Sequence, residues 1–454
     1  MTDATTTALA SYATSFGWND LTEAAIGAVK MRILDSIGCA AGGFGAEPCR
    51  IARVLAADVT ARHPARVWFT PLSTAPDMAA FANAAMVRYL DWNDTMTLLG
   101  SGHPSDMIPV LVAAAEASGR SGRDLILAIA SAYEAFAALA RMLSIRERGW
   151  DQGLFIGVSA AVGLARLFGL SHAETCDALA LTITPCVPTR QTRAGELSMW
   201  KACATAASTR AALFAVSLAQ AGMTGPDRPF EGRHGIFELV TGPFVLPAFA
   251  DRAHPFAVEL SHIKSFPSEF HSQAPIWLAL DLRRQLGTEE IARIDIQTYW
   301  IGYSEIGAEA EKWHPKTRET ADHSLPFLVA TALRHGTVGM ESFTDARIAD
   351  PDLIALMAKI HITEDKFFTA RYPGELLSRI EITTASGRRI TEETSYPRGH
   401  ARNPLSEAEL AAKFARAANG LLSDAATQRI ADAVQGLDAL GQVGEFTVAL
   451  AASA

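Results

Sequence analysis

Apolar residues recur at intervals of three and four positions over most of the first 225 residues of the chain, with few polar interruptions. This spacing is typical of helices that bury one face or more. It predicts six alanine-rich helices, at residues 21–41, 77–90, 106–117, 123–144, 157–168 and 201–221. Because alanine and glycine side chains let helices approach closely, we expect these helices to form one compact all-helical domain.

The pattern changes after residues 249–264, where proline and histidine interrupt it. Residues 294–299 alternate between apolar and polar as a strand does, and residues 380–384 and 390–396 flank Ser386-Gly387 as the two strands of a hairpin. Between these strands we expect helices at 322–334 and 351–360. The middle of the chain is therefore predicted to be α+β.

Helical periodicity returns beyond Pro404, where Ser406 and Glu409 form a capping-box pattern before an apolar run. The last helices have too few partners to fold alone, so we expect them to pack on the first domain. The predicted fold is mainly α. A large all-α domain is built from residues 1–262 and 403–454, and a smaller α+β lid domain, residues 263–402, is inserted between these parts.

Composition limits the class of protein. The chain has 454 residues, 49% hydrophobic and 20% charged, which is enough to bury a large core. Its formal net charge of −9 disfavours nucleic acid and anionic membranes as partners. The chain begins without the basic and then apolar order of a secretory signal, and we see no uninterrupted apolar run of membrane-spanning length, so we expect a cytoplasmic protein.

Polar chemistry is concentrated at residues 90–106, between two apolar stretches. Asp91, Thr95, His103 and Ser105 lie here, and Ser105 comes just before a predicted helix. We expect Ser105 to cap that helix, whose N-terminal end would attract an anion such as a carboxylate. The alternative is that these residues only form turns and caps.

Three further clusters carry candidate groups. Lys264 and His271 belong to a polar stretch at the domain junction, a preferred place for ligand sites. Lys201 precedes an apolar helix, and from this local pattern we expect its ammonium group to reach solvent, with pairing to a buried charge as the alternative. Asp322 is expected to cap the next helix, and His323 follows it.

Several cofactor and metal motifs are missing from the sequence. It contains no glycine-rich phosphate loop, no Gly-x-Ser-x-Gly elbow and no His-Glu-x-x-His helix. The five cysteines form no Cys-x-x-Cys pair, and none of the twelve histidines has a tight metal-ligand spacing. We therefore expect a reaction that needs neither a metal nor a nucleotide cofactor.

Taken in this order, the clusters resemble those of the MmgE/PrpD family over nearly the whole chain. The resemblance is carried by residues 90–95, 102–106, 199–201, 222–226 with 231–232, 264–273 and 321–326. It implies a helical domain with an inserted α+β lid, an active site in the cleft between them, and a homodimer. It also implies a small anionic di- or tricarboxylate as substrate and no obligatory cofactor.

The resemblance also suggests site residues. The expected catalytic residues are Asp91, His103, Lys201 and Lys264, and the expected substrate-binding residues are Thr95, Ser105, His271 and His323. Dehydration of a β-hydroxy acid needs a base, an acid and cations that hold carboxylates. We expect the two lysines to bind substrate carboxylates while Asp91 and His103 share proton transfer. Which of the two is the base is left open.

The activity that the resemblance implies is that of a carbon–oxygen lyase that dehydrates a hydroxy acid resembling 2-methylcitrate. An isomerase or epimerase, a decarboxylase, and an inactive helical binding protein are the alternatives. Two positions depart from family patterns. Asp151-Gln152 stands where decarboxylase-type members carry a histidine, and Phe327 stands where several members carry tyrosine. These departures make decarboxylation of cis-aconitate less expected, and the exact acid stays undetermined.

Overall fold

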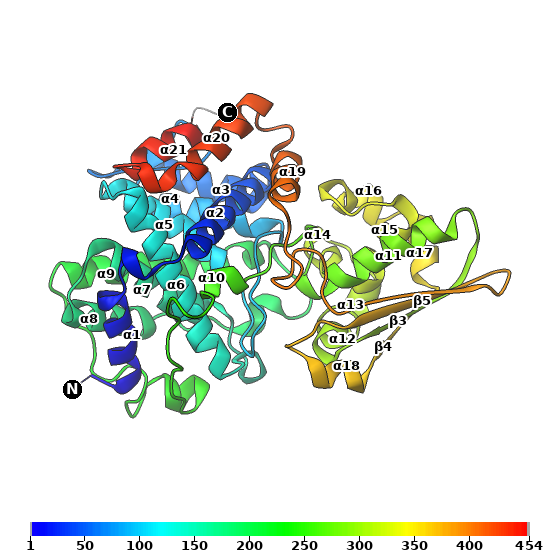
Figure 1. Ribbon diagram of the computed structural model, residues 1–454, viewed down its shortest axis with the longest axis horizontal. Coiled ribbons are helices and arrows are strands. Elements are labelled where there is room, and N and C mark those ends of the chain that lie inside the picture. The colour runs from blue at the N-terminus through cyan, green and yellow to red at the C-terminus, as the bar shows by residue number, and fades with distance from the viewer. Residues whose placement is uncertain (1, 452–454) are drawn as a thin grey trace.

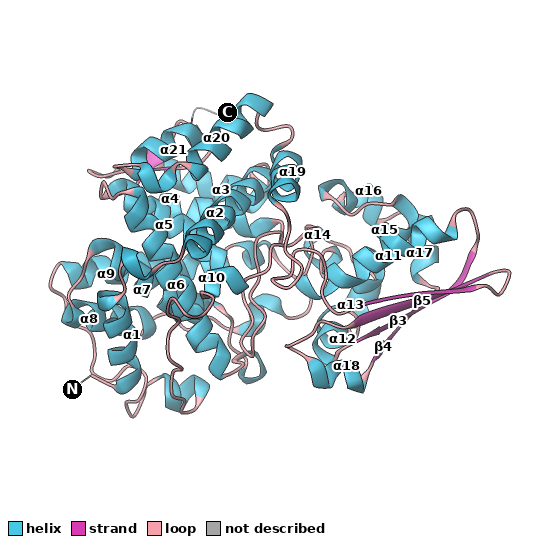
Figure 2. Ribbon diagram, viewed as in Figure 1, coloured by secondary structure: helices cyan, strands magenta, loops and turns pink. Residues whose placement is uncertain are grey.

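The computed structural model describes residues 2–451 and is mainly helical. It has a large lobe of helices and a small lobe that contains the main sheet (Figures 1 and 2). The helices of the large lobe from the first part of the chain are α1 (Ala4–Ser15), α2 (Glu23–Gly43), α3 (Glu47–Ala57), α4 (Pro76–Tyr89), α5 (Ile108–Ala117), α6 (Gly122–Met142), α7 (Gly153–Phe168), α8 (His172–Ile183), α9 (Ala204–Gln220) and α10 (Ala257–Leu260). A short hairpin, β1 (Ala65–Arg66) and β2 (Ser73–Thr74), lies between α3 and α4.

The six helices predicted from the periodicity are present as α2, α4, α5, α6, α7 and α9. Helices α6 and α7 pack against each other at the centre of the large lobe and are buried along almost their whole length. Helix α6 is long and apolar enough to cross a membrane, which was not expected from the sequence. However, 89% of its most apolar 18-residue segment is buried within the protein. A core helix has the same character, so α6 is weak evidence for a membrane span.

The last helices of the chain also belong to the large lobe (Figure 1). They are α19 (Glu407–Ala418), α20 (Asp424–Gln435) and α21 (Val443–Ala451). Helix α19 begins with the predicted capping box of Ser406 and Glu409 and packs against α2. Phe414, Ile430 and Phe446 join the same hydrophobic core as the first part of the chain. The large lobe is thus built from both ends of the chain.

The small lobe has a separate hydrophobic core around a four-stranded sheet of order β4-β3-β5-β6. Its strands are β3 (Ile291–Thr298), β4 (Ile360–Glu364), β5 (Ser378–Thr384) and β6 (Arg389–Thr394), with β4 parallel to β3 and the other pairs antiparallel. Its helices are α11 (Gln273–Leu286), α12 (Trp300–Ile306), α13 (Ala310–Trp313), α14 (Arg318–Ala321), α15 (Leu325–His335), α16 (Asp345–Ile348), α17 (Pro351–Met357) and α18 (Lys366–Arg371). The predicted strand and hairpin are confirmed as β3, β5 and β6.

Three local predictions are wrong. The helix expected at 351–360 ends at Met357, and Ile360 already begins β4. Asp322 does not cap α15, because Ser324 accepts the hydrogen bond from the Phe327 amide. The helix expected from residue 106 begins at Ile108, and Ser105 does not cap it: Ser105 lies inside a preceding 3-10 turn, Pro104–Met107, where its amide donates to Asp94 Oδ1. That amide is therefore not free to bind an anion.

Two chain segments connect the lobes and run beside each other. The Ile263 amide donates to the Gly399 carbonyl at 3.0 Å, and the rings of His262 and His400 stack with centroids 4.1 Å apart. Gly399 has a φ of +95°, and a Cβ there would lie 1.9 Å from the Ile263 oxygen, so glycine is required at this contact. This crossing fixes Lys264, the next residue, at the junction of the lobes.

Candidate active site

Asp91 is the centre of a buried ionic cluster between the lobes. It follows α4 with a φ of +51°, a left-handed conformation that is uncommon for residues other than glycine. Its carboxylate lies 2.9 Å from Arg88 Nη1 and 3.2 Å from Lys201 Nζ, and it also accepts a short hydrogen bond from Lys264 Nζ. These four side chains are each at most 2% exposed. One carboxylate is thus surrounded by three cations.

The surroundings of Asp91 determine its protonation. Burial alone would raise its pKa, but Arg88, Lys264 and Lys201 together hold the pKa of Asp91 well below the ordinary aspartate value. Burial also lowers the pKa of Lys264, although the Asp91 carboxylate opposes that shift. A carboxylate whose pKa is this low is a weak base at neutral pH. The structure therefore makes Asp91 a fixed negative charge.

His103 has the properties of a base. Its Nδ1 lies 2.7 Å from the Asp94 carbonyl oxygen, which can only accept, so Nδ1 carries the proton and Nε2 of the neutral ring has a free lone pair. Burial lowers the pKa of His103 well below the ordinary histidine value, and repulsion from Arg88 and Lys264 lowers it further. The ring is therefore neutral near pH 7. Nε2 lies 4.0 Å from Asp91 Oδ1.

Lys201 joins Asp91 to a second carboxylate. Its ammonium group lies 3.0 and 3.1 Å from the two oxygens of Asp322, which is fully buried. The expectation that Lys201 reaches solvent is therefore wrong, and the alternative, pairing with a buried charge, is found. Its ammonium group and that of Lys264 contact protein carboxylates, so direct binding of a substrate carboxylate by either lysine stays a prediction.

His323 lies between the two carboxylates. Its Nδ1 is 2.5 Å from Asp322 Oδ1, and its Nε2 is 3.5 Å from Asp91 Oδ2. Burial and the Lys201 charge lower the pKa of His323, while Asp322 and Asp91 oppose this shift. A further negative charge nearby would therefore favour the imidazolium form.

The three remaining predicted residues, Thr95, Ser105 and His271, make hydrogen bonds in the segments around this ionic cluster. Thr95 Oγ1 lies 3.0 Å from His103 Nδ1. The Ser105 hydroxyl accepts a hydrogen bond from Asn93 Nδ2 and is 1% exposed. His271 Nδ1 lies 2.5 Å from the Tyr299 hydroxyl. These positions indicate roles in holding the loops, and direct substrate contact by these three residues stays a prediction.

A cavity of about 250 Å³ opens beside this centre, and we call it the active-site cavity. Asp91, His103 and His323 line it, together with four arginines and three glutamates. The complete lining is Arg88, Asp91, His103, Arg146, Gln152, Arg190, Arg193, Ala194, Glu269, Ser304, Glu305, Glu309, Lys312 and His323. Its cations suit an anionic ligand, and His103 and His323 can exchange protons with one.

Sequence reasoning missed the cavity arginines. Arg146 lies in a short 3-10 turn before α7, and Arg190 and Arg193 lie in another before α9. Arg193 Nε is 2.6 Å from Asp151 Oδ2, a carboxylate with no exposed surface, and Arg193 Nη2 is buried without a hydrogen-bond partner. In the sequence these loops stand out only because each contains more than one arginine. Arginines are equally common in solvent-exposed turns, so this pattern does not indicate a binding site.

Gln152 occupies the position noted as a departure from decarboxylase-type patterns. Its Oε1 accepts the His103 amide hydrogen at 2.9 Å. A Cβ on Gly102 would lie 2.2 Å from that oxygen and 2.7 Å from the Phe136 ring. Gln152 therefore positions the His103 backbone, and the absence of a side chain at Gly102 leaves room for the Gln152 side chain.

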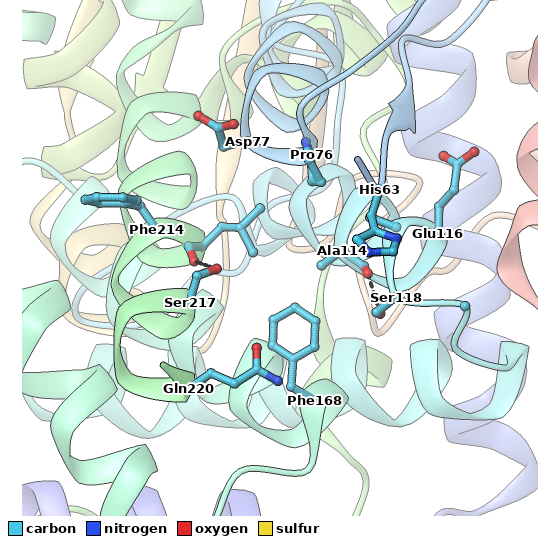
Figure 3. Close-up of a pocket in the computed structure, with 13 residues that line it drawn as sticks. His63, Pro76, Asp77, Ala114, Glu116, Ser118, Phe168, Phe214, Ser217 and Gln220 are labelled. Atoms are coloured by element: carbon cyan, nitrogen blue, oxygen red, sulfur yellow. Dashed lines mark hydrogen bonds between the residues drawn. The ribbon is translucent and has the colours of Figure 1, made fainter. Parts of the chain in front are cut away.

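Figure 3 shows another cavity, of about 760 Å³, on the large lobe between α5 and α9. Phe168, Phe214 and Ser217 lie around it, and its lining includes none of the predicted site residues. Two of its acidic side chains already have cationic partners, Arg66 for Glu116 and Arg210 for Asp77. The smaller cavity beside His103 is therefore the better candidate for catalysis.

The described residues, 2–451, contain no cluster of three or more His, Cys, Asp or Glu side chains arranged to hold a metal ion. The fold and this site define a mainly helical two-lobed protein with an ionic, histidine-containing centre between its lobes. Residues 7–247 match the MmgE/PrpD N-terminal domain and residues 266–439 match the MmgE/PrpD C-terminal domain. The chain belongs to the MmgE/PrpD family.

Curated relatives are similar over most of their length. The 2-methylcitrate dehydratase of Escherichia coli (strain K12) is 27% identical over 404 residues, which cover 82% of this chain and 81% of the relative. The mitochondrial 2-methylcitrate dehydratase of Yarrowia lipolytica is 26% identical over 438 residues, covering 88% and 81%. The cis-aconitate decarboxylase of Homo sapiens is 25% identical over 456 residues, covering 95% and 91%.

Proposed function

We propose that the protein is a hydro-lyase that dehydrates a small hydroxy di- or tricarboxylic acid resembling 2-methylcitrate. The observation that carries this proposal is the free Nε2 lone pair of a neutral His103 at a cavity lined by four arginines. Similarity to enzymes named 2-methylcitrate dehydratase supports the same reaction class. The small lobe, residues 263–402, would act as the lid over this cavity.

In the proposed mechanism His103 Nε2 removes the proton from the carbon next to a substrate carboxylate. The electrons of that C–H bond form the C=C bond, and the C–O bond to the β-hydroxyl breaks. His323 in its imidazolium form donates the proton with which hydroxide leaves as water. The negative charges of the bound substrate raise the pKa of His323 toward this state, while Asp322 and Asp91 stabilise it.

Cavity arginines would hold the substrate carboxylates and the charge that develops as the proton leaves. Arg193 presents a buried Nη2 that has no hydrogen-bond partner, and guanidinium groups bind carboxylates in a bidentate manner. Lys201 and Lys264 would then act indirectly, by keeping Asp91 ionised beside the histidines. The predicted sharing of proton transfer between Asp91 and His103 thus becomes a proposal with His103 as the base.

A panel of hydroxy di- and tricarboxylates tests this function. We expect ultraviolet absorbance from an unsaturated acid with at least one substrate, and an absorbance change that is roughly 10²–10⁴ times slower with His103→Gln. Equal rates for the wild type and His103→Gln would refute the mechanism. Exchange of the α-hydrogen in deuterated water without an unsaturated product would indicate an epimerase. Failure of the entire panel to react would favour a binding protein.

Decarboxylation is the second candidate, because the similarity to human cis-aconitate decarboxylase covers 95% of the chain. Asp151-Gln152 stands where decarboxylase-type patterns have a histidine, and Gln152, which lines the cavity, offers an amide that cannot act as an acid. Release of carbon dioxide from cis-aconitate would establish this candidate over the dehydratase.

We also propose a homodimer. Helix α3 exposes Ile51, Val54 and Leu55 at 42–53% of their surface, and a row of exposed apolar residues on one helix is typical of an interface. Light scattering should give twice the chain mass of 48.5 kDa, and a monomeric mass would refute the proposal.

A further inference from the structure

One glutamate in the lining of the active-site cavity is paired with cavity arginines. Glu305 lies on α12 in the small lobe, and both of its carboxylate oxygens are 2.7 Å from Arg190 Nη2 in the large lobe. Arg146 Nη1 lies 3.9 Å from the same carboxylate. All three side chains line the cavity. A lobe-bridging ion pair thus occupies two of the cations that a substrate carboxylate would need.

The size and charge of the cavity agree with this arrangement. Its volume of about 250 Å³ is slightly below the ~300–1,000 Å³ typical of small-molecule sites. Burial would raise the pKa of Glu305, but Arg146 and Arg190 lower it, so the side chain is ionised at neutral pH. An ionised glutamate inside the cavity repels an anionic substrate and competes with it for the same guanidinium groups.

The pair between Arg190 and Glu305 is also partly accessible to water. Its side chains are 19% and 33% exposed, for Arg190 and Glu305, so water can solvate the glutamate once it leaves. Water screens a partly exposed ion pair more than a buried one, so this pair should cost less to open than the buried pairs around Asp91. The buried pairs around Asp91 differ in this respect, because their side chains are at most 2% exposed.

We propose that Glu305 is an internal competitor of the substrate. Its carboxylate occupies the Arg190–Arg146 subsite when the cavity is empty, and a substrate carboxylate displaces it. This inference rests on the proposed function, because it takes the occupant of the cavity to be a polycarboxylate. Glu305 therefore sets substrate affinity without taking part in proton transfer.

Calorimetric titration of the protein with tricarballylate, an unreactive tricarboxylate, tests the proposal. We expect Glu305→Gln to bind it about three- to tenfold more tightly than the wild type, because the competing charge is gone. The matched control is Glu311→Gln, which removes one charge from an exposed residue of the same lobe outside the cavity lining, and it should leave the affinity unchanged. In an Arg190→Gln background, Glu305→Gln should give a smaller gain, because competition for Arg190 is gone while the repulsion by the Glu305 charge and its pairing with Arg146 remain.

Kinetics supply a second readout. With the substrate of the proposed reaction, KM of Glu305→Gln should fall by the same factor while kcat stays constant. Unchanged or weaker tricarballylate binding by Glu305→Gln, with normal binding by the wild type, would overturn the competitor role alone. If neither the wild type nor any variant bound tricarballylate, the carboxylate site of the proposed function would fail as well. Binding by Glu305→Gln alone would support the competitor role.

Discussion

Replacing Lys201 by methionine would expose how strongly the buried charges depend on one another. The substitution removes an ammonium group that lies 3.2 Å from Asp91 and 3.0 Å from Asp322, and it keeps a flexible side chain of similar length. Both carboxylates then lose a cationic neighbour in a region from which water is excluded. We expect the variant to fold with a lower free energy of unfolding.

The expected loss in the free energy of unfolding depends on the cationic partners that Asp91 and Asp322 keep. Removing one partner of a buried ion pair costs about 3–5 kcal/mol. Asp91 keeps Arg88 and Lys264, and Asp322 keeps Arg318 at 3.2 Å, so we expect the low end, about 3 kcal/mol. For a chain of 454 residues the corresponding drop in Tm is about 3 °C.

Thermal unfolding of the complete protein, followed by circular dichroism at two pH values, measures this effect. Asp322 has a lowered pKa in the folded protein, so its stabilising effect is present above the unfolded pKa and is lost as the pH falls. The difference between the wild type and Lys201→Met should therefore be largest at neutral pH and shrink below about pH 4. Lys366→Met, at an 85% exposed lysine, should behave as the wild type. An unchanged Tm for Lys201→Met at pH 7 would refute this reasoning.

Four other predictions concern histidines and Gly102, the residue before His103. His103→Gln should lower kcat by roughly 10²–10⁴ while the melting curve stays near that of the wild type. Because the pKa of His103 is lowered, kcat/KM should show no acid-side inflection near pH 6.5, and an inflection there would contradict its assignment as the base. Burial lowers the pKa of His262 well below its usual value and that of His400 to about 4, so the unfolded chain binds protons that the folded protein does not. Urea titrations should therefore show stability declining as the pH falls below about 6.5, by at most about 1.4 kcal/mol per pH unit for each imidazole, and a flat profile would count against these shifts. Gly102→Ala should reduce kcat in a steady-state assay, because its Cβ would displace Gln152, and full activity would show that this contact is unimportant.

Much of the helical architecture could be predicted from periodicity alone, because α2, α4, α6, α7 and α9 are long and their apolar positions are regular. Shorter elements were less predictable. Strand β4 has five residues, of which only Ile360 is buried, so its sequence differs little from the end of a helix. Parallel pairing with β3 creates this strand, and that pairing is not visible in a local pattern.

The candidate site shows the same limit. Asp91, His103 and His323 could be proposed from local clusters, and all three line the cavity. The state of Lys201 could not be predicted, since its partner Asp322 lies 121 residues away in the sequence. The cavity arginines were missed for a related reason: a loop arginine becomes a binding group only when the fold turns it toward a cavity.

The central claim is that the cavity beside His103 holds an organic acid with its reacting carbon at Nε2. A crystal structure of the protein with bound tricarballylate tests it most directly. We predict carboxylates on the cavity arginines, Glu305 displaced from Arg190, and a CH₂ carbon next to His103 Nε2. Tricarballylate bound only elsewhere, for example in the cavity of Figure 3, with the His103 cavity empty, would contradict the claim.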